Sequence, residues 1–380
     1  MNIALSSPGV GGFSARFDTG FLVAFAALLS IGLVMVASSS LDFSAERYGD
    51  AWMLFRKQCI FLMMGLSVGA VMLFIPTSIW ERYSGIFLVL AIVLLIAVLI
   101  PGVGKVVNGS RRWLPMGLFS MQASELAKIC LVLFFASYLA RRSQEVKGSW
   151  TAFFVMISVI GFVVILLLLE PDFGSSVVIV FTLGSMMFVA GVPILRFLLV
   201  ALMAISAFAA IAVLSPYRWE RLVAFMDPWS RQFDSGYQLV QSLIAFGRGE
   251  WFGLGLGNSL QKLFFLPEAH TDFIFAIFAE EFGLVGALVL VGVFIFFLSK
   301  IFRLSLRANL EGKLFSAYLS FGIAVMLSVQ AFINMGVASG LLPTKGLTLP
   351  LMSYGGSSLL VTLALIALVL RINWELNDGK

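Results

Sequence analysis

The sequence predicts an all-α integral membrane protein, a polytopic bundle of about ten transmembrane helices. Hydrophobic residues make up 60% of the 380-residue chain, charged residues only 12%, and the mean hydropathy is +1.02. Soluble domains carry roughly a quarter charged residues, so lipid is the solvent that this composition fits. The apolar runs approach the ~20 residues that a helix needs to cross a bilayer, whereas barrel strands would be about 10 residues long.

Charged or Pro/Gly-rich breaks separate most of the apolar runs. The sixth and seventh runs are divided only by residues 191–196, which makes that boundary the least distinct. We place the spans at about 20–39, 57–75, 84–101, 119–140, 153–169, 175–192, 194–214, 273–298, 314–338 and 354–372.

An even number of spans puts both chain ends on one side of the membrane. Lys and Arg are more frequent in the segments on the N-terminal side than in the short loops opposite, which favours cytoplasmic ends. We therefore expect a cytoplasmic tail at 1–19, a membrane domain at 20–372 and a second cytoplasmic tail at 373–380.

The remaining composition excludes several classes of protein. The net charge of +5 is spread over loops, so nucleic acid is not an expected partner. Cys59 and Cys130 both lie in apolar spans and imply neither a disulfide nor a metal framework. His270 is the only histidine, which argues against a histidine-based metal cluster.

One connection, residues 215–272, is far longer than the others and lies between the predicted seventh and eighth spans, on the extracytoplasmic side. Loops of this length are usually functional or disordered. Its many Trp, Tyr and Phe residues argue against disorder and favour packing on the protein or at the membrane interface. Apolar positions at helical spacing predict a short amphipathic helix at 236–246.

Asp272 stands at the first turn of the eighth span, on the outer side. A carboxylate there is favoured by the helix dipole and by N-capping. The alternative is a general base at the mouth of a polar cavity. His270 is either an interfacial histidine with its bonds satisfied or a group that orients a substrate.

Charges inside apolar spans are costly and need an explanation. Glu125 and Lys128 lie one helical turn apart in the fourth span, where they either pair as structural glue or line a polar cavity. Asp172 belongs to the outer turn Glu-Pro-Asp-Phe-Gly at 170–174, which Pro and Gly explain as a turn. It is nonetheless an acidic group on the same side as Asp272.

Basic and small residues gather on the outer face at Arg111, Arg112, Lys345 and the Ser353 region. They suit either a polyanionic substrate such as a lipid pyrophosphate or ordinary snorkelling at the interface. The Gly-rich stretch at 247–259 is a weak phosphate-binding signal. Residue physics alone leaves three classes open: an enzyme acting on a lipid-linked substrate, a lipid transporter and an ion-coupled carrier.

Longer motifs resemble one known family. They are GSRRW (109–113), ASELAK (123–128), PDFGSS (171–176), PEAHTDFIF (267–275) and LPLMSYGGSS (349–358), together with most of the loop from 217 onward. In these the chain is similar to the SEDS family of cell-wall proteins over nearly its whole length, and to its division branch more than to its elongation branch. Ala123 departs from the proline usual in the family, a change expected to alter local rigidity rather than chemistry.

The resemblance implies a peptidoglycan glycosyltransferase that polymerises lipid II on the outer face of the bacterial cytoplasmic membrane. Asp272 matches the family's essential aspartate and would deprotonate the acceptor hydroxyl in an inverting transfer. Arg111, Arg112, Lys128 or a divalent cation (Mg or Mn) would stabilise the leaving pyrophosphate. No organic cofactor is expected, and the metal ligands are unknown. The expected substrate-binding residues are Arg111, Arg112, Glu125, Lys128, Asp172, His270, Lys345 and Ser353.

The resemblance also implies partners and a place. Beside lipid II and the nascent glycan strand, these are a class B penicillin-binding protein and the regulatory membrane proteins of the divisome, at the division septum. Two alternatives remain from other classes: a lipid II flippase, and a scaffold that activates the crosslinking partner.

Overall fold

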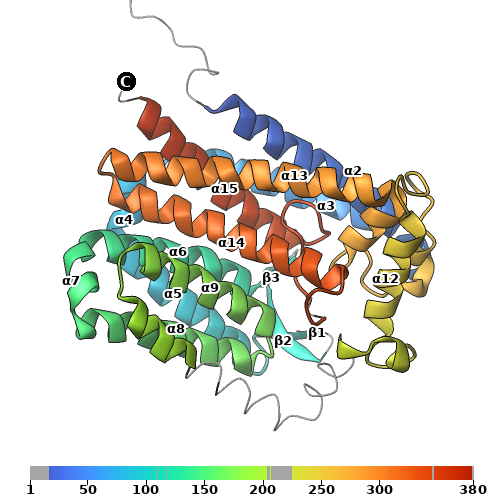
Figure 1. The fold of residues 1–380 in the computed structure, drawn as a ribbon, viewed down its shortest axis with the longest axis horizontal. Helices are drawn as coiled ribbons and strands as arrows, with labels where there is room; N and C mark the ends of the chain where they lie inside the picture. The colour runs from blue at the N-terminus through green and yellow to red at the C-terminus, as the bar shows by residue number, and fades with distance from the viewer. Residues whose placement is uncertain are drawn as a thin grey trace, which may run out of the picture.

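The computed structural model describes residues 17–107, 109–117, 119–202, 206, 225–344 and 346–378. The longer helices run roughly parallel along the longest axis of the molecule (Figure 1). The helices are α2 (Thr19–Tyr48), α3 (Met53–Phe74), α4 (Thr77–Arg82), α5 (Ser84–Leu99), α6 (Ala123–Arg141), α7 (Ser143–Gly148), α8 (Trp150–Leu169), α9 (Phe173–Val189), α12 (Tyr237–Gly249), α13 (Ile274–Leu310), α14 (Leu314–Ala338) and α15 (Gly356–Asn377).

The predicted multi-pass helical fold is confirmed. Within the described ranges, seven helices are long and apolar enough to cross a membrane: α2, α3, α6, α8, α13, α14 and α15. The shorter apolar helices α5 and α9 coincide with two further predicted spans. The predicted span at 194–214 is helical over 194–202, and most of its remainder falls outside the described residues.

A small antiparallel sheet between α5 and α6 was not predicted. Its order is β1 (Lys105–Val107), β2 (Ser110–Pro115) and β3 (Ser120–Gln122), with β2 in the centre. The span expected from residue 119 therefore begins as a strand and becomes helical only at Ala123. Strands this short carry too little periodicity to be recognised against a long apolar run.

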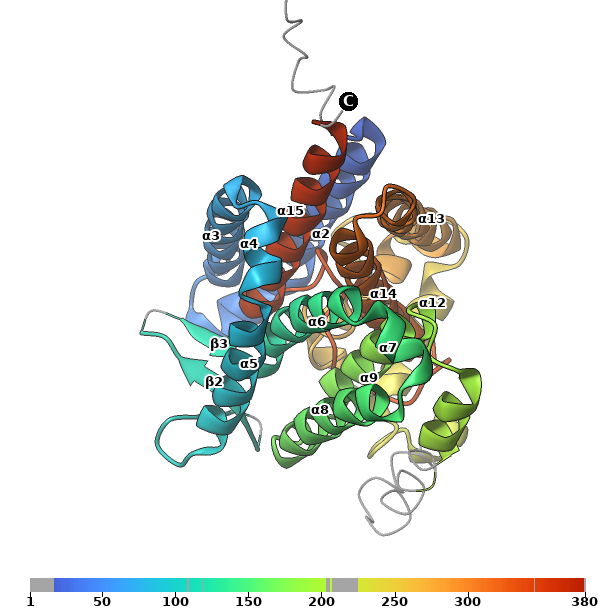
Figure 2. The same cartoon turned by 90° about the vertical axis from the view of Figure 1, so that its left-hand side faces the viewer.

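The interior of the bundle is built around α6 and α15. In each of these helices 72% of the most apolar stretch is buried, against 22% in α3. Figure 2 shows α6 between α15 and the α8–α9 pair. Polar side chains on α6 are therefore surrounded by protein rather than by lipid.

The long helix α13 is interrupted at Gly283, whose φ of +70° favours glycine. The loop after α12 docks at this break: the amides of Leu254 and Gly255 donate to the carbonyls of Glu280 and Glu281, at 3.0 and 2.9 Å. A Cβ atom at Gly249 would overlap the carbonyl of Ala279. Glycine thus permits the loop after α12 to pack directly on the helix that follows Asp272. The helix expected at 236–246 is confirmed by α12.

Candidate active site

Asp272 lies immediately before α13 and is half-buried. Its main chain is fixed at both ends, because its amide donates to the Glu268 carbonyl (3.1 Å) and its carbonyl accepts from Asn334 Nδ2 (2.8 Å). Its carboxylate, by contrast, forms no hydrogen bond or ion pair with any described residue. It does not cap α13, whose N-cap residue is Phe273 and has no side-chain capping bond. The backbone is held while the carboxylate is left available.

The electrostatics of Asp272 favour a proton acceptor near neutral pH. Burial, and then the nearby charge of Glu268, raise its pKa from 3.8 to about 7, while the Arg112 guanidinium acts in the opposite direction. A general base works best when its pKa is near the working pH. Gly346 closes over this group: a Cβ atom there would lie 2.5 Å from Asp272 Oδ2.

His270 is buried between aromatic rings, with centroids 4.8 Å from Phe43 and 5.7 Å from Tyr354. Its carbonyl accepts from the Tyr354 amide at 2.9 Å. Burial lowers the pKa of the imidazole, so the ring is neutral. This arrangement fits an interfacial histidine that ties the start of α13 to the segment before α15, and a role in substrate binding stays a prediction.

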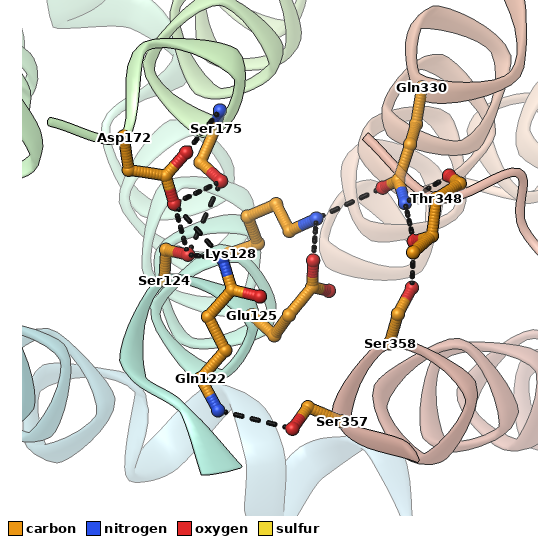
Figure 3. A network of polar contacts seen from close by, with 10 residues as sticks. All are labelled: Gln122, Ser124, Glu125, Lys128, Asp172, Ser175, Gln330, Thr348, Ser357 and Ser358. Carbon is orange, nitrogen blue, oxygen red and sulfur yellow. Dashed lines mark hydrogen bonds and ion pairs between the residues drawn. The ribbon is translucent and has the colours of Figure 1, made fainter. Parts of the chain in front are cut away.

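Glu125 and Lys128 form a buried ion pair on α6 (Figure 3). Lys128 Nζ lies 2.9 Å from Glu125 Oε1 and 2.9 Å from Gln330 Oε1 on α14. Gln330 in turn donates to the Thr348 carbonyl (3.1 Å). Gln330 and Asn334 are one turn apart on α14, so one helix face joins the ion pair to the backbone of Asp272.

Asp172 caps the start of α9 and accepts hydrogen bonds through both carboxylate oxygens (Figure 3). Oδ2 accepts from Ser124 (2.7 Å), Ser175 (2.8 Å) and Gln122 (3.1 Å), and Oδ1 accepts from the Ser175 amide (3.2 Å). The group is 2% exposed. The Asp172 carboxylate therefore accepts hydrogen bonds that join α6 to α9, whereas the Asp272 carboxylate accepts none from the described residues.

Arg111 and Arg112 are adjacent on strand β2, where successive side chains point to opposite faces. Arg111 turns back to the Leu99 carbonyl at the end of α5 (3.1 Å). Arg112 reaches the turn between α8 and α9 and donates to the carbonyls of Glu170 (3.1 Å) and Pro171 (3.0 Å). Of the two predicted arginines, Arg112 is therefore the one whose charge acts on Asp272.

Of the two remaining residues predicted to bind substrate, the structure describes Ser353. Ser353 is buried, and its hydroxyl accepts from the Leu349 amide (2.8 Å) within the turn before α15. Lys345 falls outside the described residues.

Some polar groups of the bundle were not singled out from the sequence. Glu170 is fully buried, and both its carboxylate oxygens lack a hydrogen-bond partner in the described chain. Burial and the charge of Asp172 raise its pKa to about 8, so it is neutral at pH 7. Gln330 and Asn334 were missed as well, although two amides four residues apart in an apolar span are a signal of a polar interior face.

Glu280 and Glu281 on α13 hold the loop that follows α12. Glu281 pairs with Lys262 Nζ (3.0 Å) and accepts from Ser38 (2.7 Å). Glu280 accepts from the Ser259 hydroxyl and pairs with Arg248 (3.2 Å). Both carboxylates therefore serve the docking of the loop on α13.

An apolar cavity of about 300 Å³ lies between α9 and α14, beside the polar network. Val329 and Ile333 line it from α14, next to Gln330 and Asn334, and Leu342 closes one end. An apolar cavity alongside charged groups suits an amphiphilic substrate.

These features define a multi-pass membrane protein with an ion-paired polar interior and, at one end of the bundle, a carboxylate that has no partner among the described residues. Residues 19–378 match the profile of the cell cycle protein family of FtsW, RodA and SpoVE, and the chain belongs to that family. This confirms the resemblance to SEDS proteins.

Relatives and solved structures agree over nearly the whole chain. The protein named "Probable peptidoglycan glycosyltransferase FtsW" of Saccharophagus degradans is 65% identical, with all of both chains covered. That of Hahella chejuensis is 50% identical over 96% of this chain and 91% of its own. A chain of a solved peptidoglycan synthase complex that coordinates polymerization and crosslinking superposes with a TM-score of 0.76 at 33% identity, covering 95% and 98% of the two chains. RodA of Thermus thermophilus gives 0.70 at 30% identity over 94% and 96%.

Proposed function

We propose that this chain is a peptidoglycan glycosyltransferase that polymerises lipid II into glycan strands, with Asp272 as the general base. The observation that carries the proposal is the Asp272 carboxylate, which is half-buried, lacks a partner among the described residues and has its pKa raised to about 7. The curated relatives are named for the same activity.

In the proposed reaction Asp272 takes the proton of the acceptor sugar's 4-hydroxyl as that oxygen attacks the anomeric carbon of the donor. The bond between the anomeric carbon and the pyrophosphate oxygen breaks, and the configuration at carbon inverts. One carboxylate suffices because pyrophosphate leaves readily, whereas glycoside hydrolases need a second carboxyl group to protonate a poor leaving group.

Charge on the departing pyrophosphate is stabilised by Arg112 in this proposal. Its guanidinium acts electrostatically on Asp272 and is held by the Glu170 and Pro171 carbonyls. Nε and Nη2 of Arg112 are occupied by Glu170, Ser110 and Pro171, whereas its Nη1 has no partner among the described residues and can donate a charge-assisted hydrogen bond to a phosphate oxygen. Lys128 is 1% exposed and already binds Glu125 and Gln330, so it supports the polar interior rather than contacting pyrophosphate.

No group of three or more His, Cys, Asp or Glu side chains that could hold a metal ion occurs among the described residues, so a divalent cation here would also need oxygens of the substrate. Glu268 and Asp272 are neighbouring carboxylates, and Mg²⁺ is commonly held by one or two carboxylates together with substrate phosphates. Glu268 is the residue proposed to hold it, which leaves Asp272 to accept the proton. When bound, the cation would neutralise part of the charge on the pyrophosphate.

The proposed setting is the bacterial cytoplasmic membrane at the septum, with cytoplasmic chain ends and Asp272 on the extracytoplasmic face. The bias of Lys and Arg toward the side of the chain ends supports this orientation. The similarity to a chain of a synthase complex that couples polymerization with crosslinking supports a class B penicillin-binding protein as partner. Regulatory membrane proteins of the divisome complete the proposed partners.

The test is polymerisation of labelled lipid II by the purified protein with its crosslinking partner, comparing wild type with Asp272→Asn. A matched control is Asp42→Asn, which makes the same change at an exposed carboxylate near the outer end of α2. We expect long glycan from wild type and Asp42→Asn, and none from Asp272→Asn. Equal polymer from all three proteins would exclude Asp272 as the base, and no polymer from any would favour a flippase or a scaffold.

A further inference from the structure

A polar cavity lies at the opposite end of the bundle from Asp272. Its volume is about 420 Å³, and it is enclosed by the start of α2 and the ends of α13 and α15. These segments come together at the upper left in Figure 1, near the C-terminus. Its polar lining consists largely of Asp18, Lys300, Arg303, Arg307, Asn373 and Asn377.

The cavity carries an excess of positive charge. Lys300, Arg303 and Arg307 are spaced three and four residues apart, which places them on one face of α13. Asp18 is the only carboxylate among the described residues that line the cavity, and Glu311, outside the lining, pairs with Arg307. Arg303 therefore adds a positive charge that neither carboxylate offsets. Lys300 Nζ pairs with Asp18 at 3.0 Å, which fixes the start of α2 against α13.

Of the three cations that line the cavity, Arg303 is the one without a partner among the residues that the structure describes. Arg307 is held by Glu311 (3.0 Å) and by the Leu376 carbonyl (2.7 Å). Arg303 forms no hydrogen bond or ion pair with any residue that the structure describes, and it is exposed. Residues 1–16, which precede the cavity, contain no Asp or Glu that would neutralise it. An exposed guanidinium beside two anchored cations is a binding group for phosphate oxygens.

The apolar part of the lining indicates where the phosphate comes from. Phe17, Phe21, Leu304 and Val369 border the same cavity. A soluble phosphate would form no favourable contact with these apolar side chains, whereas the glycerol and upper acyl region of a phospholipid would pack against them. The uninterrupted part of α13, from Leu284 to Leu310, rises about 39 Å, which exceeds the ~30 Å hydrocarbon core. The cations lie toward its C-terminal end, which places them at the membrane surface opposite Asp272.

We propose that this cavity binds the phosphate of an anionic phospholipid, with Arg303 contacting the phosphate oxygens and Lys300 and Arg307 supplying the surrounding positive charge. The site is distinct from the proposed active site. Its assignment to the cytoplasmic leaflet rests on the proposed orientation, but the binding itself does not.

The test is retention of phosphatidylglycerol, compared with phosphatidylcholine, by the purified full-length protein in detergent, measured by native mass spectrometry. We expect wild type to prefer phosphatidylglycerol and Arg303→Gln to lose about five- to tenfold of that affinity. Arg303→Lys, which keeps the charge, should retain most of it. The matched control is Arg82→Gln, an exposed arginine on α4 that stacks over Tyr83 and does not line the cavity.

Equal losses in Arg303→Gln and Arg82→Gln would overturn the proposal, because general surface charge would then explain the binding. Equal retention of the two lipids by wild type would overturn it as well. Inorganic pyrophosphate distinguishes the source: if it binds alone in an Arg303-dependent manner and phosphatidylglycerol does not, the ligand is a soluble phosphate and the lipid assignment is wrong. None of these measurements depends on glycan synthesis, so they are independent of the proposed activity.

Discussion

The buried ion pair on α6 yields a quantitative prediction about stability. Lys128 is the only described group that binds the Glu125 carboxylate, at 2.9 Å, and the two side chains are 1% and 6% exposed. Replacing Lys128 by Met leaves that carboxylate charged and unpaired in the interior. Breaking a buried pair from one side costs about 3–5 kcal/mol, mainly because the remaining charge is uncompensated. Glu125→Gln, which strands the ammonium, should cost a similar amount.

The double variant Glu125→Gln/Lys128→Met removes both charges at once. It should be more stable than either single variant, because no uncompensated charge remains. Residues in direct contact show interaction energies of about 0.5–3 kcal/mol in double-mutant cycles, and this pair should lie at the upper end. Gln330 loses its contact with the ammonium in Lys128→Met and in the double variant alike, so that loss cancels in the cycle.

The chain contains a matched reference pair. Arg142 and Glu145 have the same three-residue spacing and the same 2.9 Å separation, but their side chains are 53% and 57% exposed. Exposed pairs contribute about 0.2–1 kcal/mol, so the corresponding single variants should change stability little. Thermal and denaturant unfolding of the detergent-solubilised protein, followed by intrinsic fluorescence, measures both cycles. Equal interaction energies in the two cycles would refute the reasoning. It would also be refuted if the loss of stability in Glu125→Gln/Lys128→Met equalled the sum of the losses in the two single variants.

Four further predictions concern the proposed active site and the docked loop. Polymer formation should rise with pH to a plateau above about 7, because Asp272 must be deprotonated to act, and initial rates between pH 5.5 and 8.5 check this. Since its pKa is raised from 3.8 to about 7, the folded protein holds a proton that the unfolded chain releases, and stability falls as pH rises through that window. Asp272→Asn should therefore melt higher than wild type at pH 8 and like wild type at pH 3.5. Gly346→Ala should lower activity about tenfold or more by displacing Asp272 Oδ2, whereas Gly161→Ala, with open space around it, should not. Gly249→Ala should lower the melting temperature, because its Cβ would meet the Ala279 backbone, which cannot yield as a side chain can.

The membrane helices were predictable because length and hydropathy determine them almost alone. The predicted spans at 84–101 and 314–338 correspond to α5 and α14 within two residues at each end. The sheet before α6 could not be predicted from the sequence, because the pairing of β2 with β1 and β3 depends on contacts that an apolar run does not encode. The break in α13 at Gly283 was hidden for the same reason: only the docking of the loop requires it.

Asp172 and Asp272 show where sequence reasoning about a site stops. Each stands just before an apolar helix on the same side of the predicted bundle, so each was equally suited to capping or to chemistry. The difference comes from other segments. Ser124 and Gln122, about 50 positions earlier in the chain, occupy Asp172. Asn334 binds only the backbone of Asp272 and leaves its carboxylate open. A carboxylate that already accepts four hydrogen bonds has little acceptor capacity left for a substrate hydroxyl, whereas a carboxylate without partners among the described residues can accept one. Partner count, which is set by the tertiary fold, therefore separates the structural aspartate from the candidate base.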